Sequence, residues 1–127
     1  MGRKQVGLIL YTSYFANYKN VSPDIQCVSI ANSKPSSIVI PKWIEVVPNW
    51  TYVQYFKNGQ ISFELFSSMY LNYLINLRYS YDFMNYLEHF KSDVCLLCYE
   101  KEINQCHRKV LADFLVKFFN VNYFGEI

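Results

Sequence analysis

The sequence predicts an α/β fold: a three-layer sandwich with a mostly parallel, Rossmann-like central sheet, formed by a single domain over residues 1–127. Short apolar runs alternate with longer amphipathic segments, which is typical of strands connected by helices. The runs lack polar residues at alternate positions, as expected for strands that are buried on both faces. Hydrophobic residues make up 52% of the chain, which is enough for one substantial core.

Two strands are predicted in the first half of the chain. Residues 5–11, QVGLILY, are apolar almost throughout, which indicates a central strand that opens into a loop at 12–17. Residues 25–30, IQCVSI, indicate a second, shorter strand. Residues 39–47 contain Pro41 and precede another proline, which favours loop or irregular edge structure. Residues 50–56, WTYVQYF, fit either a short strand or a turn.

Helices dominate the second half. Ser62 is a suitable N-cap, and apolar residues then recur at helical spacing over residues 63–77. A second helix is predicted from about residue 81 to 90, followed by a buried strand at 94–98. The last predicted elements are a helix over about 105–119 and a short strand at 121–124.

Reactive side chains follow the buried strand at 94–98. The sequence CYEKEINQCHR, residues 98–108, leads into a helix whose first turn holds Cys106, His107 and Arg108. The unpaired backbone N–H groups and the dipole at a helix start favour anions. Because ligands of parallel sheets bind beyond the carboxyl ends of the strands, we expect a functional site here.

Each side chain of this stretch has a functional and a structural interpretation. Cys106 is in a setting that lowers a thiol pKa, or it is a buried cysteine without chemistry. Arg108 could hold a phosphate or carboxylate, or form a salt bridge to Glu100. Glu100 could act as an acid or base, and His107 as a base, a metal ligand or a cap. The candidate catalytic residues are Cys106, Glu100 and His107, and the candidate ligand-binding residues are Ser13, Tyr14, Tyr99 and Arg108.

The sequence predicts no cofactor and no metal. Its four glycines do not form a Walker A or GxGxxG motif. Cys98, Cys106 and His107 invite a zinc interpretation, but their spacing is unusual for structural zinc and no fourth ligand is evident. The four cysteines lie in or beside apolar runs, which favours reduced thiols over a disulfide framework.

Charge and hydropathy restrict the location and the partners. A formal net charge of +2 is too small to argue for nucleic acid. The chain has neither an apolar run long enough to span a membrane nor a secretory signal, so a cytoplasmic protein is expected.

Two motifs resemble those of a known family. LLCYEKEINQCHRKVLADFL, residues 96–115, resembles the signature of the DUF488 family, in which a Cys-x-Glu strand end leads to a Cys-His-Arg helix start. LYTSYFANYKNV, residues 10–21, is similar to the start of members found in phages and bacteria. The resemblance implies a small cytosolic α/β domain with an active or binding site, and it assigns no reaction. The motif positions that carry over are Tyr11, Ser13, Tyr14, Cys98, Glu100, Cys106, His107 and Arg108.

The leading hypothesis is the binding of an anionic, nucleotide-like small molecule at the carboxyl edge of the sheet. On the resemblance alone, a phage protein that sequesters a nucleotide signal of host defence, in the host cytoplasm, is one concrete form of it. One alternative is an enzyme of phosphoryl, acyl or glycosidic-bond chemistry that uses Cys106 as nucleophile or Glu100 as acid/base. Another is a protein-interaction module whose aromatic surface includes Trp43, Trp50 and Tyr52. Homo-oligomerisation is left open.

Overall fold

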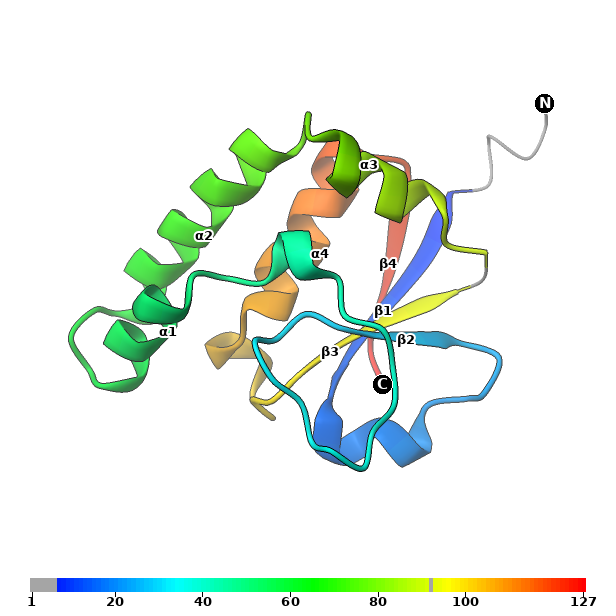
Figure 1. The fold of residues 1–127 in the computed structure, drawn as a ribbon, viewed down its shortest axis with the longest axis horizontal. Coiled ribbons are helices and arrows are strands. Elements are labelled where there is room, and N and C mark those ends of the chain that lie inside the picture. The colour runs from blue at the N-terminus through cyan, green and yellow to red at the C-terminus, as the bar shows by residue number, and fades with distance from the viewer. Residues whose placement is uncertain (1–6, 92) are drawn as a thin grey trace.

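The computed structural model describes residues 7–91 and 93–127 of the chain (Figure 1). Its centre is a four-stranded, all-parallel sheet with the strand order β2-β3-β1-β4. The predicted α/β class with a parallel central sheet is therefore confirmed. Gln5 and Val6, the start of the first predicted strand, lie outside the described residues. The strands are β1 (Leu8–Tyr14), β2 (Gln26–Ser29), β3 (Val94–Cys98) and β4 (Val121–Glu126).

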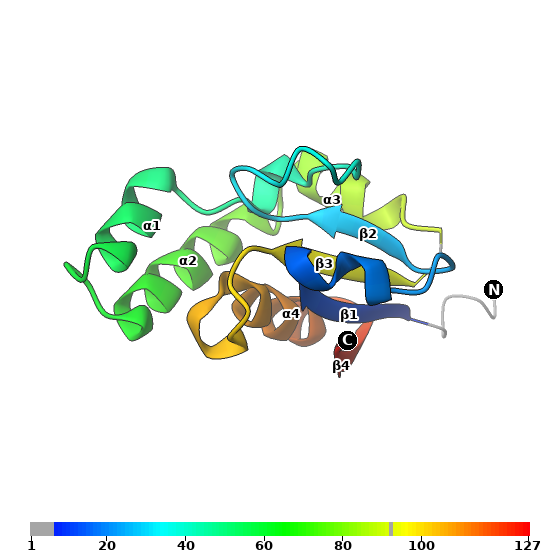
Figure 2. The ribbon, with the colours of Figure 1, turned by 90° about the horizontal axis from the view of Figure 1, so that it is seen from below.

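The helices form layers around this sheet. The helix α4 (His107–Phe118) contacts β1, β3 and β4, and α2 (Phe63–Leu77) packs on the outer side of α4 (Figure 2). The short 3-10 helix η2 (Phe15–Asn20) contacts β1 and β3 on the side of the sheet away from α4. The result is the three-layer arrangement expected from the sequence.

The two inner strands, β3 and β1, end at the same edge of the sheet. Every residue of β3 is buried, as its uninterrupted apolar run predicts. In the parallel register, Tyr14 at the end of β1 lies beside Cys98 at the end of β3. β1 extends to Tyr14, so residues 12–14, expected in a loop, belong to the strand.

Serine caps fix the starts of two helices. The Ser62 side chain accepts a hydrogen bond of 3.0 Å from the Leu65 N–H, and α2 spans the residues predicted for it. The Ser80 side chain accepts a hydrogen bond from the Phe83 N–H at the start of α3 (Tyr81–Glu88).

None of the described helices is long and apolar enough to cross a membrane.

The prediction of a strand or turn at residues 50–56 is wrong. The segment forms the helix α1 (Trp50–Lys57). Asn49, just outside that segment, accepts hydrogen bonds from the N–H groups of Thr51 (2.9 Å) and Tyr52 (3.3 Å). This capping outweighs the strand preference of the aromatic and β-branched residues.

Trp43 lies in the core, which corrects the aromatic surface proposed from the sequence. Its indole is fully buried and stacks on the rings of Phe83 and Tyr86, both at 5.3 Å. Trp50 and Tyr52 do remain exposed.

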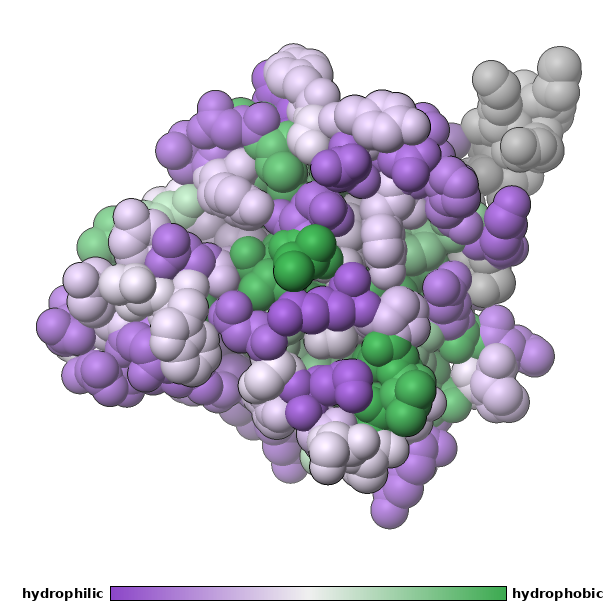
Figure 3. Space-filling model, viewed as in Figure 1, coloured by the Kyte–Doolittle hydropathy of each residue, from purple (hydrophilic) through white to green (hydrophobic). Residues whose placement is uncertain are grey.

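Apolar surface lies over the 3-10 helix η3 (Ile44–Val46) and the loop before it (Figure 3).

Candidate functional site

A pocket with about 560 Å³ of empty space, part of it open to solvent, lies between α1 and the loop that joins β3 to α4. Cys98, Cys106 and His107 line it from the sheet edge and from the start of α4. Lys57 and Glu100 also line it and form an ion pair of 2.9 Å. The remaining wall is largely apolar and aromatic, with Trp50, Val53, Phe56, Phe66 and Tyr99.

Four of the seven candidate site residues line the pocket and three do not. Cys106, His107, Tyr99 and Glu100 line it, whereas Ser13, Tyr14 and Arg108 do not. Ser13 is buried at the end of β1, close to the pocket in the sheet. Its hydroxyl donates to the Ile127 carbonyl at 3.3 Å and accepts from the Asn17 amide at 3.2 Å. The ends of β1 and β3 therefore do not make one composite pocket, whereas residues 31–33, which follow β2, do line it beside the end of β3.

Cys98 and Cys106 form a disulfide, which corrects the expectation that all cysteines are reduced. The expectation failed because it treated each cysteine by its local apolar setting. The loop between β3 and α4 folds back, so that the last residue of β3 and the N-cap of α4 meet at the pocket. Cys27 and Cys95 are free and buried, as expected.

His107 is held in one tautomer by a backbone contact. Its Nε2 lies 2.6 Å from the Ile30 carbonyl oxygen and must carry the proton to donate to it. Its Nδ1 therefore keeps a lone pair and lies 3.9 Å from the Cys106 Sγ. Burial is the main cause that lowers the pKa of His107 to about 4, so the ring is neutral at neutral pH.

The neutral His107 predicts an acid-sensitive fold in the oxidised protein. As the pH falls, the unfolded chain protonates this histidine near its ordinary pKa of 6.5, whereas the folded protein resists until about 4. The stabilisation is present above pH 6.5 and is lost below it. The free energy of unfolding should fall by about 3 kcal/mol between about pH 7 and pH 4, measured by urea denaturation.

The second histidine provides a matched control for this prediction. His89 is exposed, so the His89→Asn variant should keep the wild-type slope of stability against pH. The His107→Asn variant should flatten that slope, whatever its absolute stability. Equal slopes in the wild type and His107→Asn would contradict a buried, neutral His107.

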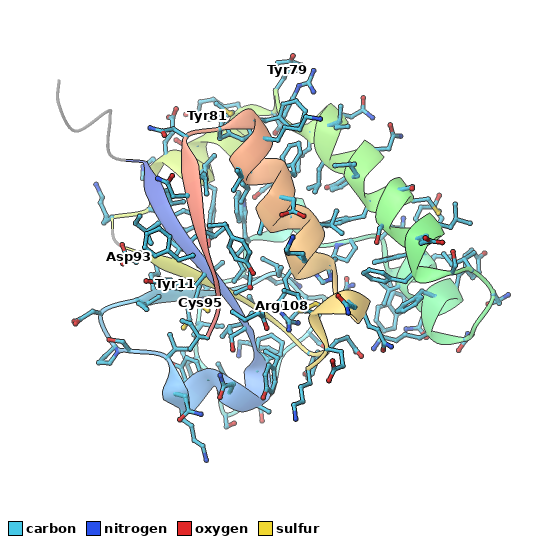
Figure 4. All side chains as sticks on the ribbon, turned by 180° about the vertical axis from the view of Figure 1, so that it is seen from behind. Tyr11, Tyr79, Tyr81, Asp93, Cys95 and Arg108 are labelled. Carbon is cyan, nitrogen blue, oxygen red and sulfur yellow. A yellow bond between two sulfur atoms is a disulfide. The ribbon has the colours of Figure 1, made fainter. Side chains whose placement is uncertain are left out.

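Arg108 is fully buried at the start of α4 and points into the protein (Figure 4). Its Nε and Nη2 each donate to the Glu126 carboxylate at 2.8 Å. Its Nη1 donates to the Glu100 carbonyl at 2.5 Å and to the Cys98 Sγ at 3.3 Å, and Nη2 also donates to the Lys101 carbonyl at 2.9 Å. Protein acceptors thus take all five guanidinium N–H groups, and two of these acceptors are main-chain carbonyls of the β3–α4 loop.

The acidic partner of Arg108 is Glu126, so the salt bridge to Glu100, one of the two alternatives considered for Arg108 from the sequence, is wrong. Burial would raise the pKa of the Glu126 carboxyl, but hydrogen bonds from Arg108 and Thr12 outweigh it and lower that pKa. The main-chain carbonyl of Glu100 instead accepts a hydrogen bond from Arg108, and its carboxylate forms the ion pair with Lys57.

Sequence reasoning missed the part of the pocket that comes from α1. Trp50, Phe56 and Lys57 belong to a segment for which no helix was predicted. A helical interpretation of residues 50–57, with Asn49 as cap, would have placed Val53, Phe56 and Lys57 within one turn. Nothing local to the sequence identifies Glu126, because 18 residues separate it from Arg108.

A family model described as "Domain of unknown function DUF488" matches residues 45–115, which is more than half of the chain. The match includes α1, α2, α3 and β3, together with the Cys98, Cys106 and His107 cluster. Neither the comparison with curated proteins nor the comparison with solved structures gave a match.

Proposed function

The chain belongs to the DUF488 family, a domain of unknown function, and we propose that it binds an anionic, nucleotide-like small molecule in the pocket beside α1. The observation that carries this proposal is the uncapped start of α4 at the pocket. Cys106 is the N-cap and makes no side-chain capping hydrogen bond, and the first turn has no acidic residue. Because the N-cap side chain does not occupy them, the first backbone N–H groups and the dipole of this helix favour an anion at the pocket.

The pocket wall supplies the other two properties that a nucleotide needs. Trp50 is 57% exposed at the pocket and can stack on a base, a contact that contributes about 1–3 kcal/mol. Lys57 provides a cation whose present partner, Glu100, is also partly exposed. Exposed ion pairs contribute little, so a phosphate can replace the Glu100 carboxylate at small cost.

Calorimetric titration with adenosine monophosphate, with inorganic phosphate as the second probe, tests the proposal. Lys57→Ala should weaken binding of both probes by about tenfold to a hundredfold, the loss expected for one charge-assisted contact. Trp50→Ala should weaken the nucleotide by about tenfold or more and leave phosphate binding unchanged.

The matched control is Lys19→Ala in η2, because Lys19 does not line the pocket. It should bind both probes like the wild type. If Lys57→Ala and Trp50→Ala also bind both probes like the wild type, the pocket is not the site.

The fate of the nucleotide separates binding from catalysis. Sequestration of a nucleotide signal, the phage role implied by the resemblance, requires that the ligand is released unchanged. Enzymatic chemistry by a reduced Cys106 or by Glu100 requires turnover. Mass spectrometry of the nucleotide after incubation with reduced protein distinguishes the two, and a product that persists in the Cys106→Ser variant would exclude Cys106 as nucleophile.

A further inference from the structure

Three buried residues at the pocket bring together side-chain atoms of the kinds that coordinate metal ions. The Sγ atoms of Cys98 and Cys106 and a ring nitrogen of His107 all lie within 4.8 Å of one another, and all three residues are buried. We propose that the reduced protein binds one Zn²⁺ through Cys98 Sγ, Cys106 Sγ and His107 Nδ1, with the fourth coordination position open to the pocket.

The backbone spacing of the two cysteines suits a shared ion. Their Cα atoms lie 7.3 Å apart, beyond the usual disulfide range of about 4.4–6.8 Å. Two thiolates bound to one tetrahedral Zn²⁺, each at about 2.3 Å, have sulfurs about 3.8 Å apart. Rotation of the two side chains out of the disulfide therefore makes room for the ion without moving β3 or α4.

The contacts around the three ligands are those that a bound metal requires. The Ile30 carbonyl accepts the His107 Nε2–H, which leaves the lone pair of Nδ1 on the side of Cys106. A backbone carbonyl behind a ligating histidine is the usual way in which its orientation is fixed. Arg108 Nη1 donates to the Cys98 Sγ at 3.3 Å, which favours the thiolate over the thiol.

The charges of the site balance when zinc is present. The two thiolates cancel the two positive charges of Zn²⁺, and the imidazole is neutral. The Arg108 guanidinium is already paired with the Glu126 carboxylate. Two buried thiolates without an ion would be costly, so the reduced cysteines keep their protons until a metal ion replaces them. A soft donor set of two sulfurs and one nitrogen selects zinc over magnesium or calcium.

The fourth position makes this site differ from a structural zinc site. Among residues 7–91 and 93–127, the cluster offers three ligands, and all three line the pocket. Three protein ligands with an open position are typical of catalytic zinc, where a water or a substrate oxygen completes the tetrahedron. This proposal does not depend on nucleotide binding, although the phosphate of a ligand in the pocket is a suitable fourth donor.

Formation of the site from the oxidised protein is a balanced two-electron step. A cellular dithiol transfers two electrons and two protons to the Cys98–Cys106 disulfide, which breaks the S–S bond and gives two thiols. Zn²⁺ then replaces both thiol protons, which pass to solvent. The dithiol becomes a disulfide.

Titration of Co²⁺ into chelator-treated protein tests the proposal without depending on a variant that folds. Phosphine-reduced wild-type protein should bind one Co²⁺ per chain, with a thiolate-to-metal charge-transfer band that Zn²⁺ abolishes. The oxidised wild type should bind Co²⁺ at least ~100-fold more weakly. Loss of a residue that only hydrogen-bonds to a metal ligand already lowers metal affinity by up to about 100-fold, and the disulfide removes two ligands. Equal binding by the two forms would overturn the proposal.

Variants assign the ligands. In reduced protein, Cys98→Ser, Cys106→Ser and His107→Asn should each weaken Co²⁺ binding by at least ~100-fold. Cys27→Ala and His89→Gln, which change the same residue types elsewhere, should bind like the wild type. Wild-type affinity in any of the three ligand variants removes that residue from the site.

Added inorganic phosphate tests the open position. It should shift the visible bands of the cobalt-loaded wild type, because a phosphate oxygen replaces the fourth ligand. A spectrum that saturating phosphate leaves unchanged would show that the fourth position is closed, and would overturn that part of the proposal.

Discussion

Trp43→Ala is expected to lower the free energy of unfolding by about 3–5 kcal/mol, the range for truncation of a large buried aromatic residue. The indole is fully buried, stacked on Phe83 and Tyr86, and edge-on to Phe90 at 5.6 Å. Its removal leaves a cavity between α3 and the loop after β2, and rigid rings cannot collapse into it. Urea denaturation followed by far-UV circular dichroism measures the loss, since a fluorescence signal would change with the tryptophan itself.

The second tryptophan is the control for this prediction. Trp50→Ala removes the same group from a position that is 57% exposed, and should cost less than about 1 kcal/mol. Trp43→Phe should cost less than Trp43→Ala, because it keeps a ring and removes a buried Nε1–H that has no hydrogen-bond partner among the described residues. If Trp43→Ala and Trp50→Ala cost the same, Trp43 is not the centre of this cluster.

The elements that could be predicted from the sequence are those whose signals are local. β3 follows from an uninterrupted apolar run, and α2 from the Ser62 cap and regular helical spacing. α1 could not be predicted in the same way, because Thr51, Tyr52 and Val53 favour strands and the decisive cap lies outside the segment. Trp43 was misplaced for a similar reason: its partners are in α3, about forty residues further along the chain.

The candidate site shows the same division between local and distant information. Cys106, His107, Tyr99 and Glu100 follow a single strand in sequence, so topology alone places them at one sheet edge. Lys57 reaches that edge from 43 residues away, and no spacing rule connects it to Glu100. Arg108 was found by its position in the Cys-His-Arg triplet, but its role depends on Glu126, which the sheet order brings beside it through β4.

The expected cost of removing Arg108 follows from these contacts. Arg108→Met should lower the free energy of unfolding by about 2–4 kcal/mol, because two main-chain carbonyls and the partly exposed Glu126 carboxylate lose the donors that the guanidinium supplies. Methionine keeps most of the aliphatic volume, so the loss reports the hydrogen bonds and the charge rather than a cavity. Lys109→Met, one position along the same helix, is the control, since Lys109 is exposed and forms its ion pair with the exposed Asp113. It should cost about 0.5 kcal/mol or less.

The double variant Arg108→Met/Glu126→Gln separates the Arg108–Glu126 ion pair from the hydrogen bonds that Arg108 donates to main-chain carbonyls. Glu126→Gln removes the carboxylate that Arg108→Met leaves without its cation, so the double variant should be more stable than the sum of the two single losses predicts, by about 0.5–1 kcal/mol because solvent screens the partly exposed Glu126. Strict additivity would show that the two side chains do not act as a pair. An Arg108→Met variant as stable as Lys109→Met would instead show that the guanidinium is free, and would restore Arg108 as a candidate for holding the anion itself.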